Sequence, residues 1–280
     1  MAAWCVKEME VVLLTGAAGQ VGSILRQHWG ARYRLKLADL PQSTAPTGGR
    51  PRADLRAGLR GPHESVCEFD CADAAAFRRA CEGVDCVVHL AADPSPGADF
   101  ATSLLSRNIV GGYNAFDAAA ASPTCRRIVF ASSINAVRGY AGEARKVAGI
   151  DQRADPGVHW GDPINPPNVY GATKCFGESL ARVFSNSHGL SCLCVRLGHP
   201  GLDMSNLAEG NWDVSSGNVS PRDCAQLFGC CVDAPLDIRF AILHGSSQHA
   251  SPMMSIEHTK QLVGYRPQDG TAFAQRAHRL

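Results

Sequence analysis

The sequence predicts a doubly wound α/β fold, in which helices cover both faces of a parallel sheet. Short apolar runs alternate with stretches of helical spacing along most of the chain, a glycine-rich turn follows the first apolar run, and an aspartate ends the second. With 280 residues and 45% hydrophobic content, the chain is long enough for one large core, or for one core with a small lobe.

A strand, a glycine-rich turn and a helix are expected near the N-terminus. An apolar strand with β-branched members is expected at 11–14 and a helix at 23–29. Between them, Gly16 would allow a tight turn, Gly19 would let the backbone approach a bound group, and Gly22 would let the helix pack close to the strand. Strand, turn and helix in this order form the dinucleotide fingerprint, in which the helix N-terminus offers N–H groups to phosphates. A plain glycine-rich turn is the alternative.

The second strand is expected at 33–38 and ends in Asp39. A carboxylate at this strand end suits the two ribose hydroxyls of NAD and repels the 2′-phosphate of NADP. The pattern therefore favours NAD, with a strand-end aspartate that only caps a turn as the alternative. Residues 41–62, rich in Pro, Gly and Arg, are expected to form an exposed, mobile insertion whose arginines are surface charges.

Strands and helices continue to alternate toward the C-terminus. A helix at 73–82 would turn Phe77 and its alanines inward, and residues 139–168, rich in Gly, Pro and charge, would form a loop over the site and a partial lid. The remaining strands are expected near 68–70 and at 85–90, 127–132, 191–196 and 240–244, and the remaining helices at 104–121, at 169–186 and after Ser220, which would be an N-cap.

Tyr170 and Lys174 lie four residues apart in the helix expected at 169–186, so their side chains share one face. A phenol is a poor base at neutral pH because its ordinary pKa is about 10. A nearby ammonium would stabilise the phenolate and lower this pKa, which would make Tyr170 a usable general base. The same spacing also occurs on solvated helix faces. In this chain, the motifs upstream favour the catalytic interpretation.

Composition and charge argue against several classes of function. The formal net charge of +1 gives no support for binding to nucleic acid or membranes, and no apolar stretch reaches the ~18 residues that span a bilayer. The N-terminus enters the first strand without a secretory signal, so a cytoplasmic location is expected. In that reducing setting the 12 cysteines are expected to be buried thiols. Histidines and cysteines lack ligand spacing, so no metal site is expected.

Seven short motifs follow one another along the chain: TGAAGQVG at 15–22, Asp39, Asp70, HLAA at 89–92, Asn108 with Gly111, FASS at 130–133 and YGATK at 170–174. In this order they resemble the extended short-chain dehydrogenases/reductases over nearly the whole chain. Within that family, the chain is most similar to uronate dehydrogenases and related NAD-dependent sugar dehydrogenases. The resemblance implies one Rossmann-type NAD-binding domain over 1–280, to which 199–239 and 245–280 contribute a small substrate lobe.

The resemblance also implies roles for the matched residues. Tyr170 would be the catalytic base, Lys174 would bind the nicotinamide ribose and lower the phenol pKa, and Ser133 would hydrogen-bond the reacting hydroxyl. The implied reaction oxidises C1 of a small sugar or uronic acid, from lactol to lactone. The residues expected at NAD are Gly16, Gly19, Gln20, Val21, Gly22, Asp39, Asp70, Cys71, Leu90, Ala91, Ala92, Asn108 and Lys174, and those expected at the substrate are Ser132, Asn135, His199 and Arg222.

The substrate half departs from the family pattern. Uronate dehydrogenases usually carry Asn-His after the second serine, where this chain has Ile134-Asn135, and a serine where this chain has His199. Their carboxylate-binding arginine lies in the following segment, but residues 200–219 contain no Arg or Lys. Arg138 or Arg222 could replace it, because a guanidinium binds a carboxylate through two parallel hydrogen bonds. A neutral aldose is the alternative substrate.

Two other functions stay open on sequence grounds. A sugar-nucleotide epimerase or dehydratase of the same family is one, although its larger C-terminal lobe has little room in this chain. The other belongs to a different class, a non-catalytic NAD-binding sensor or scaffold, which would not need Ser133, Tyr170 and Lys174 together. The family also implies a homodimer or higher homo-oligomer, formed through the helices that carry Asn108 and Tyr170.

Overall fold

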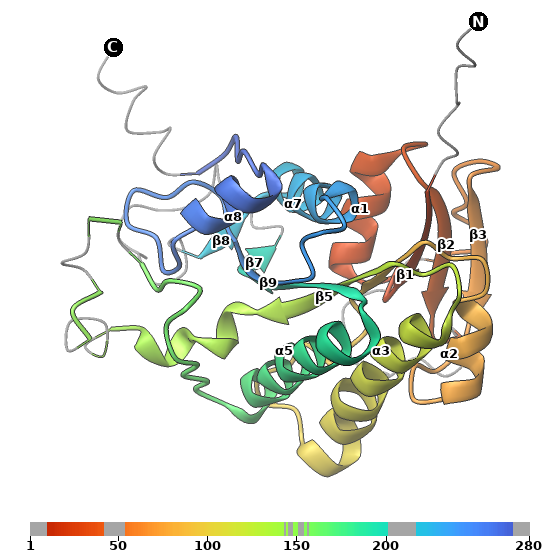
Figure 1. Ribbon diagram of the computed structural model, residues 1–280, viewed down its shortest axis with the longest axis horizontal. Helices are drawn as coiled ribbons and strands as arrows, with labels where there is room; N and C mark the ends of the chain where they lie inside the picture. The colour runs from red at the N-terminus through yellow and green to blue at the C-terminus, as the bar shows by residue number, and fades with distance from the viewer. Residues whose placement is uncertain are drawn as a thin grey trace, which may run out of the picture.

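The computed structural model describes residues 10–41, 54–142, 144, 148–150, 154–155, 157–200 and 217–270. Within these residues, seven parallel strands form one sheet in the order β3-β2-β1-β4-β5-β6-β9 (Figure 1). The strand order reverses between β1 and β4, and ligands of such sheets bind at the carboxyl ends of the strands beside this point. The strands are β1 Val11–Thr15, β2 Arg34–Asp39, β3 Glu64–Glu68, β4 Cys86–His89, β5 Arg127–Ser133, β6 Ser191–Leu197 and β9 Phe240–Gly245.

Helices cover both faces of the sheet, as Figure 1 shows. One apolar core lies between the sheet and the helices α1 and α7, and a second lies between the sheet and α2, α3 and α5. The predicted doubly wound fold is therefore confirmed. The helices are α1 Gln20–Trp29, α2 Ala74–Ala80, α3 Gly111–Ala121, α5 Val169–His188, α7 Pro221–Asp233 and α8 Glu257–Val263.

The helix predicted at 104–121 begins earlier and has two parts. Its first part, η2 (Phe100–Val110), is a π-helix, and α3 continues it directly. The side chain of Asp99 caps the start by accepting from the amide of Thr102. The sequence pattern missed this first turn because its polar residues lack the apolar spacing that marks a buried helix face.

The segment 199–239, expected to belong to a small substrate lobe, includes α7, a helix that packs in the main fold. Phe228 and other apolar residues of α7 are buried in the same core as β1 and α1. Two short strands, β7 (His199–Pro200) and β8 (Asn218–Val219), pair in parallel beside the sheet. Residues 201–216 and 271–280 lie outside the described residues, so the division into domain and lobe stays a prediction.

The segment predicted as a mobile insertion at 41–62 is partly described, and that part is anchored. The side chain of Leu55 is buried in the core beside α1. The guanidinium of Arg26 donates to the carbonyl oxygen of Gly58 at 2.9 Å and to the carboxylate of Glu64. Most of residues 54–62 are exposed, as expected, but Leu55 and the Gly58 carbonyl oxygen anchor this stretch to the core and to α1. Residues 42–53 lie outside the described residues.

The predicted loop at 139–168 packs against the end of β5 where it is described. Ile150 and Val158 join Ile134 and Val137 in a third apolar cluster, and Val158 forms a β-bridge with Met254. The cysteines of the described ranges are free thiols, and most of them are buried as expected. None of the described helices is both long and apolar enough to cross a membrane.

Candidate active site

The glycine-rich turn closes tightly against the neighbouring strand end. Gly16 has a φ of +70°, and a Cβ at this position would lie 2.8 Å from the amide nitrogen of Ala91, which follows β4. The Thr15 hydroxyl accepts a hydrogen bond from the same amide at 3.3 Å. Only glycine has both the conformational freedom and the small size that this contact requires. Leu90, Ala91 and Ala92 are half-buried along this edge of the cleft.

The start of α1 presents backbone rather than side chain to the same cleft. Gly19 is the N-cap and makes no side-chain capping hydrogen bond. A Cβ on Gly22 would lie 2.5 Å from the Gly16 carbonyl oxygen, so glycine lets the first helical turn pack on the glycine-rich turn. The first-turn amides, Val21 included, have no acceptor within their own helix, so they would be available to a bound diphosphate. The Gln20 side chain instead donates to the carbonyl oxygen of Pro200 at 2.8 Å.

Asp39 closes the rim of this cleft at the end of β2. Its Oδ2 accepts from the amide of Ala18 at 2.8 Å, and its Oδ1 accepts from the amide of Leu40, also at 2.8 Å. These bonds orient the carboxylate beside the glycine-rich turn, where it would face the ribose nearest the adenine. The residues of this cleft therefore fit NAD, and the negative charge disfavours the 2′-phosphate of NADP.

Asp70 and Cys71 lie just beyond β3. The exposed Asp70 carboxylate accepts from the amide of Ala72 at 2.9 Å. The Cys71 carbonyl oxygen accepts from the Asn114 side chain at 2.9 Å, which ties this turn to α3. Their expected contact with the adenine stays a prediction.

Asn108 joins three segments beneath the cleft. Its side-chain oxygen accepts from the amide of Asp93 at 2.8 Å, and its nitrogen donates to the Asp93 carbonyl oxygen at 3.1 Å. The same nitrogen donates to the Thr173 hydroxyl at 3.1 Å, and that hydroxyl donates to the carbonyl oxygen of Tyr170. Asn108 therefore positions the loop after β4 and the start of α5. Its expected direct contact with NAD stays a prediction.

A second network holds Ser133 beside α5. The Ser133 hydroxyl accepts from the amide and the side-chain nitrogen of Asn135, at 3.1 and 3.2 Å. The Asn135 side-chain oxygen accepts from Asn168 at 3.1 Å, and Asn168 is the N-cap of α5, accepting from the amide of Gly171. The capping residue of the helix is thus joined to the serine at the end of β5.

Tyr170 and Ser133 meet at this junction. Tyr170 is only 7% exposed, and its phenol hydrogen-bonds to the Ser133 hydroxyl. Burial raises the pKa of the Tyr170 phenol, and the negative charge of Asp93 adds to this, whereas the bond to Ser133 lowers it. The expected net lowering is therefore wrong for the protein without cofactor, because desolvation is the largest cause.

Lys174 lies one turn further along α5, as the spacing predicts. Its ammonium donates to the carbonyl oxygen of Ala131 at 2.9 Å and lies 5.8 Å from the centre of the Tyr170 ring. Burial lowers the pKa of Lys174 from 10.5 to about 8. An ammonium has three donors, so two remain for other acceptors after the bond to Ala131.

A model of the NAD dependent epimerase/dehydratase family matches residues 12–201, which is more than half of the chain. This chain belongs to that family. NAD is therefore its cofactor, in agreement with the residues around the glycine-rich turn.

Individual relatives match this chain along nearly its whole length. The NAD-dependent glucose-6-phosphate dehydrogenase of Haloferax volcanii is 33% identical over 266 residues, which cover 93% of this chain and 94% of that protein. The L-arabinose 1-dehydrogenase (NAD(P)(+)) of the same organism is 31% identical over 273 residues, 94% and 98% of the two chains. The crystal structure of uronate dehydrogenase from Agrobacterium tumefaciens has a TM-score of 0.75 and 30% identity, covering 96% of this chain and 88% of that chain.

Two residues expected at the substrate of this epimerase/dehydratase family member have other partners. The Ser132 hydroxyl donates to the Glu178 carboxylate at 2.6 Å, because consecutive strand residues point to opposite faces and Ser133 takes the other direction. Arg222 pairs with Asp269 at 2.6 Å beside the N-cap Ser220, so the helix-start interpretation of this segment is confirmed. Neither arrangement supports the expected substrate contact.

Asn168, Thr173 and Glu178 are site residues that the sequence analysis did not single out. An asparagine directly before a helix is a known N-cap signal, so Asn168 could have been found. Glu178 forms a buried ion pair with Arg196 at 2.9 Å, and no local pattern indicates that pair. Asn168 and Thr173 both bond to the backbone of α5 next to Tyr170. Asn168 accepts from the amide of Gly171, and Thr173 donates to the carbonyl oxygen of Tyr170.

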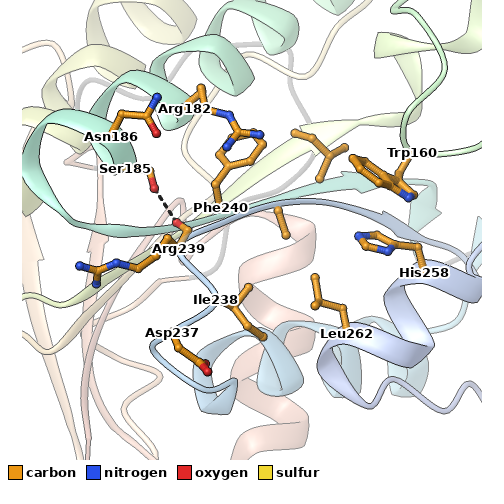
Figure 2. Close-up of a pocket in the computed structure, with 12 residues that line it drawn as sticks. Trp160, Arg182, Ser185, Asn186, Asp237, Ile238, Arg239, Phe240, His258 and Leu262 are labelled. Atoms are coloured by element: carbon orange, nitrogen blue, oxygen red, sulfur yellow. Dashed lines mark hydrogen bonds between the residues drawn. The ribbon is translucent and has the colours of Figure 1, made fainter.

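A groove of 510 Å³ lies at the other end of α5, away from the family's expected site (Figure 2). Arg182, one of its lining residues, lies about 18 Å along the helix from Tyr170 at 1.5 Å per residue. Its guanidinium lies over the ring of Phe240, and Trp160 stacks on His258 across the groove. Across the described ranges, no three His, Cys, Asp or Glu side chains form a group that could hold a metal ion.

Proposed function

We propose that this family member is an NAD-dependent dehydrogenase that oxidises C1 of a small sugar or uronic acid, from lactol to lactone. The observation that carries the proposal is the buried contact between Tyr170 and Ser133, with Lys174 on the next turn of the same helix. This group lies at the carboxyl end of β5, on the edge of the sheet where the glycine-rich turn also lies. A substrate hydroxyl between these side chains would therefore lie next to the cofactor cleft.

The chain's own residues would manage the proton in this reaction. Bound NAD supplies the hydride acceptor, and the redox chemistry belongs to it. As the C1–H bond breaks with its electron pair, the hydroxyl proton of the lactol passes to the Tyr170 phenolate and the C1–O double bond of the lactone forms. Ser133 would hydrogen-bond to the substrate oxygen and hold it at the phenol.

Lys174 would set the charge beside this proton transfer. With its ammonium held by the Ala131 carbonyl oxygen, its remaining donors are available to ribose hydroxyls, and its positive charge favours the phenolate. Because Tyr170 and Lys174 are both buried, water is largely excluded from the base, which strengthens their electrostatic interaction.

The names of the relatives support sugar oxidation but differ in the sugar. One is named for glucose 6-phosphate, one for L-arabinose at position 1, and one for uronates. Solved structures with sugar-nucleotide names, such as a dTDP-glucose 4,6-dehydratase from Streptomyces venezuelae, are 18% identical and show a shared fold alone. The proposed class of substrate is therefore a small sugar that carries no nucleotide: a neutral sugar, a sugar acid or a sugar phosphate.

Purified protein with NAD, tested against uronic acids, aldoses, sugar phosphates and UDP-sugars, should form NADH with at least one sugar that carries no nucleotide. NADH absorbance would measure the rate, and NMR would identify the lactone. Tyr170→Phe should lower kcat by roughly 10²-fold or more while NAD still binds, because it removes only the proton acceptor. Tyr113→Phe, at an exposed tyrosine on α3, is the matched control and should change neither quantity.

Three results would contradict the proposal. Conversion of a UDP-sugar without net NADH would indicate an epimerase or dehydratase. Tight NAD binding without turnover of any sugar would indicate a sensor. Full activity in Tyr170→Phe would remove this side chain from the role of base.

A further inference from the structure

Arg138 lies on a rigid platform directly after the candidate catalytic serine. Two short 3₁₀ helices, η3 (Ile134–Ala136) and η4 (Arg138–Tyr140), follow Ser133. The amide of Gly139 donates to the carbonyl oxygen of Asn165 at 2.8 Å, and the amide of Asn165 donates to that of Ala136 at 2.8 Å. A Cβ on Gly139 would overlap Asn165, so only glycine allows the two segments to lie this close. The backbone that carries Arg138 is therefore held on both sides.

The same platform is joined to the catalytic helix. Asn135 of η3 donates twice to the Ser133 hydroxyl and accepts from Asn168 at the start of α5. A Cβ on Gly171, next to Tyr170, would overlap the Asn135 carbonyl oxygen, so η3 packs directly on the first turn of α5. The position of Arg138 is thus coupled to Ser133 and Tyr170 through short, buried contacts.

His199 lies close enough to Arg138 for the arginine charge to act on its ring. It follows β6, whose Leu197 is the register partner of Ser133 in β5. A Cβ on Gly217 would lie 2.6 Å from Ile134 of η3 and 3.9 Å from the His199 ring, so this glycine brings η3 and β7 together. Burial and the positive charge of Arg138 both lower the pKa of His199, which favours a neutral ring that can donate one hydrogen bond.

The other cations around this site have partners. Lys174 donates to Ala131, Arg196 is paired with Glu178, and Arg222 is paired with Asp269. By contrast, Arg138 is half-buried, and among the residues that the structure describes no carboxylate forms an ion pair with its guanidinium.

Asp93, a carboxylate in the loop after β4, is held by two neighbouring side chains. It accepts a hydrogen bond from Ser103 and lies 3.7 Å from Arg107. Its negative charge acts on Tyr170. The negative charge of Asp93 therefore acts on the candidate base Tyr170, whereas the positive charge of Arg138 acts on His199.

We propose that Arg138, with His199 beside it, binds an anionic group of the substrate, the carboxylate of a uronic acid or the phosphate of a sugar phosphate. This inference rests on the proposed C1 oxidation and selects acidic sugars over neutral ones. A guanidinium on a fixed backbone presents two parallel N–H donors, which suit both carboxylate and phosphate oxygens. With the reacting hydroxyl at Ser133 and Tyr170, the anion at the far end of the sugar ring would face Arg138.

Three sugars with the same ring test the proposal: glucose, glucuronate and glucose 6-phosphate, which differ at C6. The wild type should have a KM for at least one of the acidic sugars roughly 10-fold or more below that for glucose. Arg138→Gln should raise that KM by a similar factor, with little change in kcat and no change for glucose. Arg138→Lys should recover part of the loss, because it keeps the charge without the two parallel donors. The acid with the lower KM distinguishes carboxylate from phosphate.

Two further variants separate the candidates. Arg78→Gln removes an exposed arginine that pairs with Asp117 far from the site, and it should leave all three sugars unchanged. Arg222→Gln tests the rival arginine. Loss of acidic-sugar selectivity in Arg222→Gln, or an equal KM for glucose and both acids in the wild type, would overturn the proposal.

Failure of the proposed function would look different from failure of this inference. NADH formation from neutral and acidic sugars alike, unaffected by Arg138→Gln, refutes the role of Arg138 alone. Absence of NADH with every sugar refutes the dehydrogenase itself and the inference with it. Circular dichroism and NAD affinity of Arg138→Gln, both expected at wild-type values, verify that a raised KM is not due to misfolding.

Discussion

Replacing Lys174 with methionine should stabilise the cofactor-free protein while removing its activity. Burial lowers the pKa of Lys174 from 10.5 to about 8, a difference that corresponds to about 3 kcal/mol of folding free energy when the side chain is charged. The variant also loses the hydrogen bond to the Ala131 carbonyl oxygen, which costs about 1–2 kcal/mol. Methionine has a similar length and is adaptable in apolar surroundings. The net gain expected at pH 7 is about 1–2 kcal/mol.

The gain should disappear at alkaline pH, because the folded pKa of Lys174 lies below the unfolded one. Below pH 8 the side chain is charged in both states, and the wild type carries the full burial penalty. Between about 8 and 10.5 the folded state releases its proton while the unfolded state keeps it, so the stability of the wild type rises with pH relative to the variant. Above 10.5 only the lost hydrogen bond remains, and the wild type should be the more stable protein.

Urea unfolding of both proteins at pH 7, 8, 9 and 10, with a thiol reductant, measures this difference. Other groups titrate alike in both proteins, so the comparison isolates Lys174. Lys36→Met is the control for loss of a lysine that bonds to backbone carbonyls, here those of Ala80 and Glu82, and it should only destabilise. A stability difference between wild type and Lys174→Met that stays constant from pH 7 to 10 would refute the reasoning.

Gly22→Ala should lower both the melting temperature and NAD affinity, because its Cβ would lie 2.5 Å from the Gly16 carbonyl oxygen; unchanged values by calorimetry would contradict the packing argument. Glu178→Ala should lower the free energy of unfolding by roughly 3–5 kcal/mol, because it leaves the Arg196 guanidinium buried without its carboxylate; a loss under about 1 kcal/mol in urea titration would count against this. The ratio kcat/KM for the best sugar should rise from pH 7 to 9, because burial raises the pKa of Tyr170 and phenolate is scarce at neutrality; a flat profile would mean that another group limits the rate.

Much of the fold and the cofactor cleft could be predicted because their signals are local. The apolar runs at β1 and β5 and the helical spacing of α5 reflect burial of one side of each segment. Gly16 and Gly22 are required by backbone contacts within one strand–turn–helix unit, and so they stand close together in the sequence.

The substrate side could not be predicted in the same way, because its residues are paired across distant segments. Arg222 and Asp269 are 47 residues apart, and Ser132 and Glu178 are 46 apart. From residue type alone, each of these side chains could have been a substrate ligand. Only the folded chain shows that their donors already have protein partners.

By itself, the sequence determined the alternation of strands and helices, the NAD cleft and the pairing of Tyr170 with Lys174 on one helix face. The tertiary structure alone decided the electrostatics of that pair, in which burial outweighs charge: the pKa of Tyr170 rises and that of Lys174 falls to about 8. It also decided which arginine stands near Ser133 without a paired carboxylate among the described residues. The reason is physical: spacing along a helix is a property of the segment, whereas desolvation and ion pairing depend on everything that packs around it.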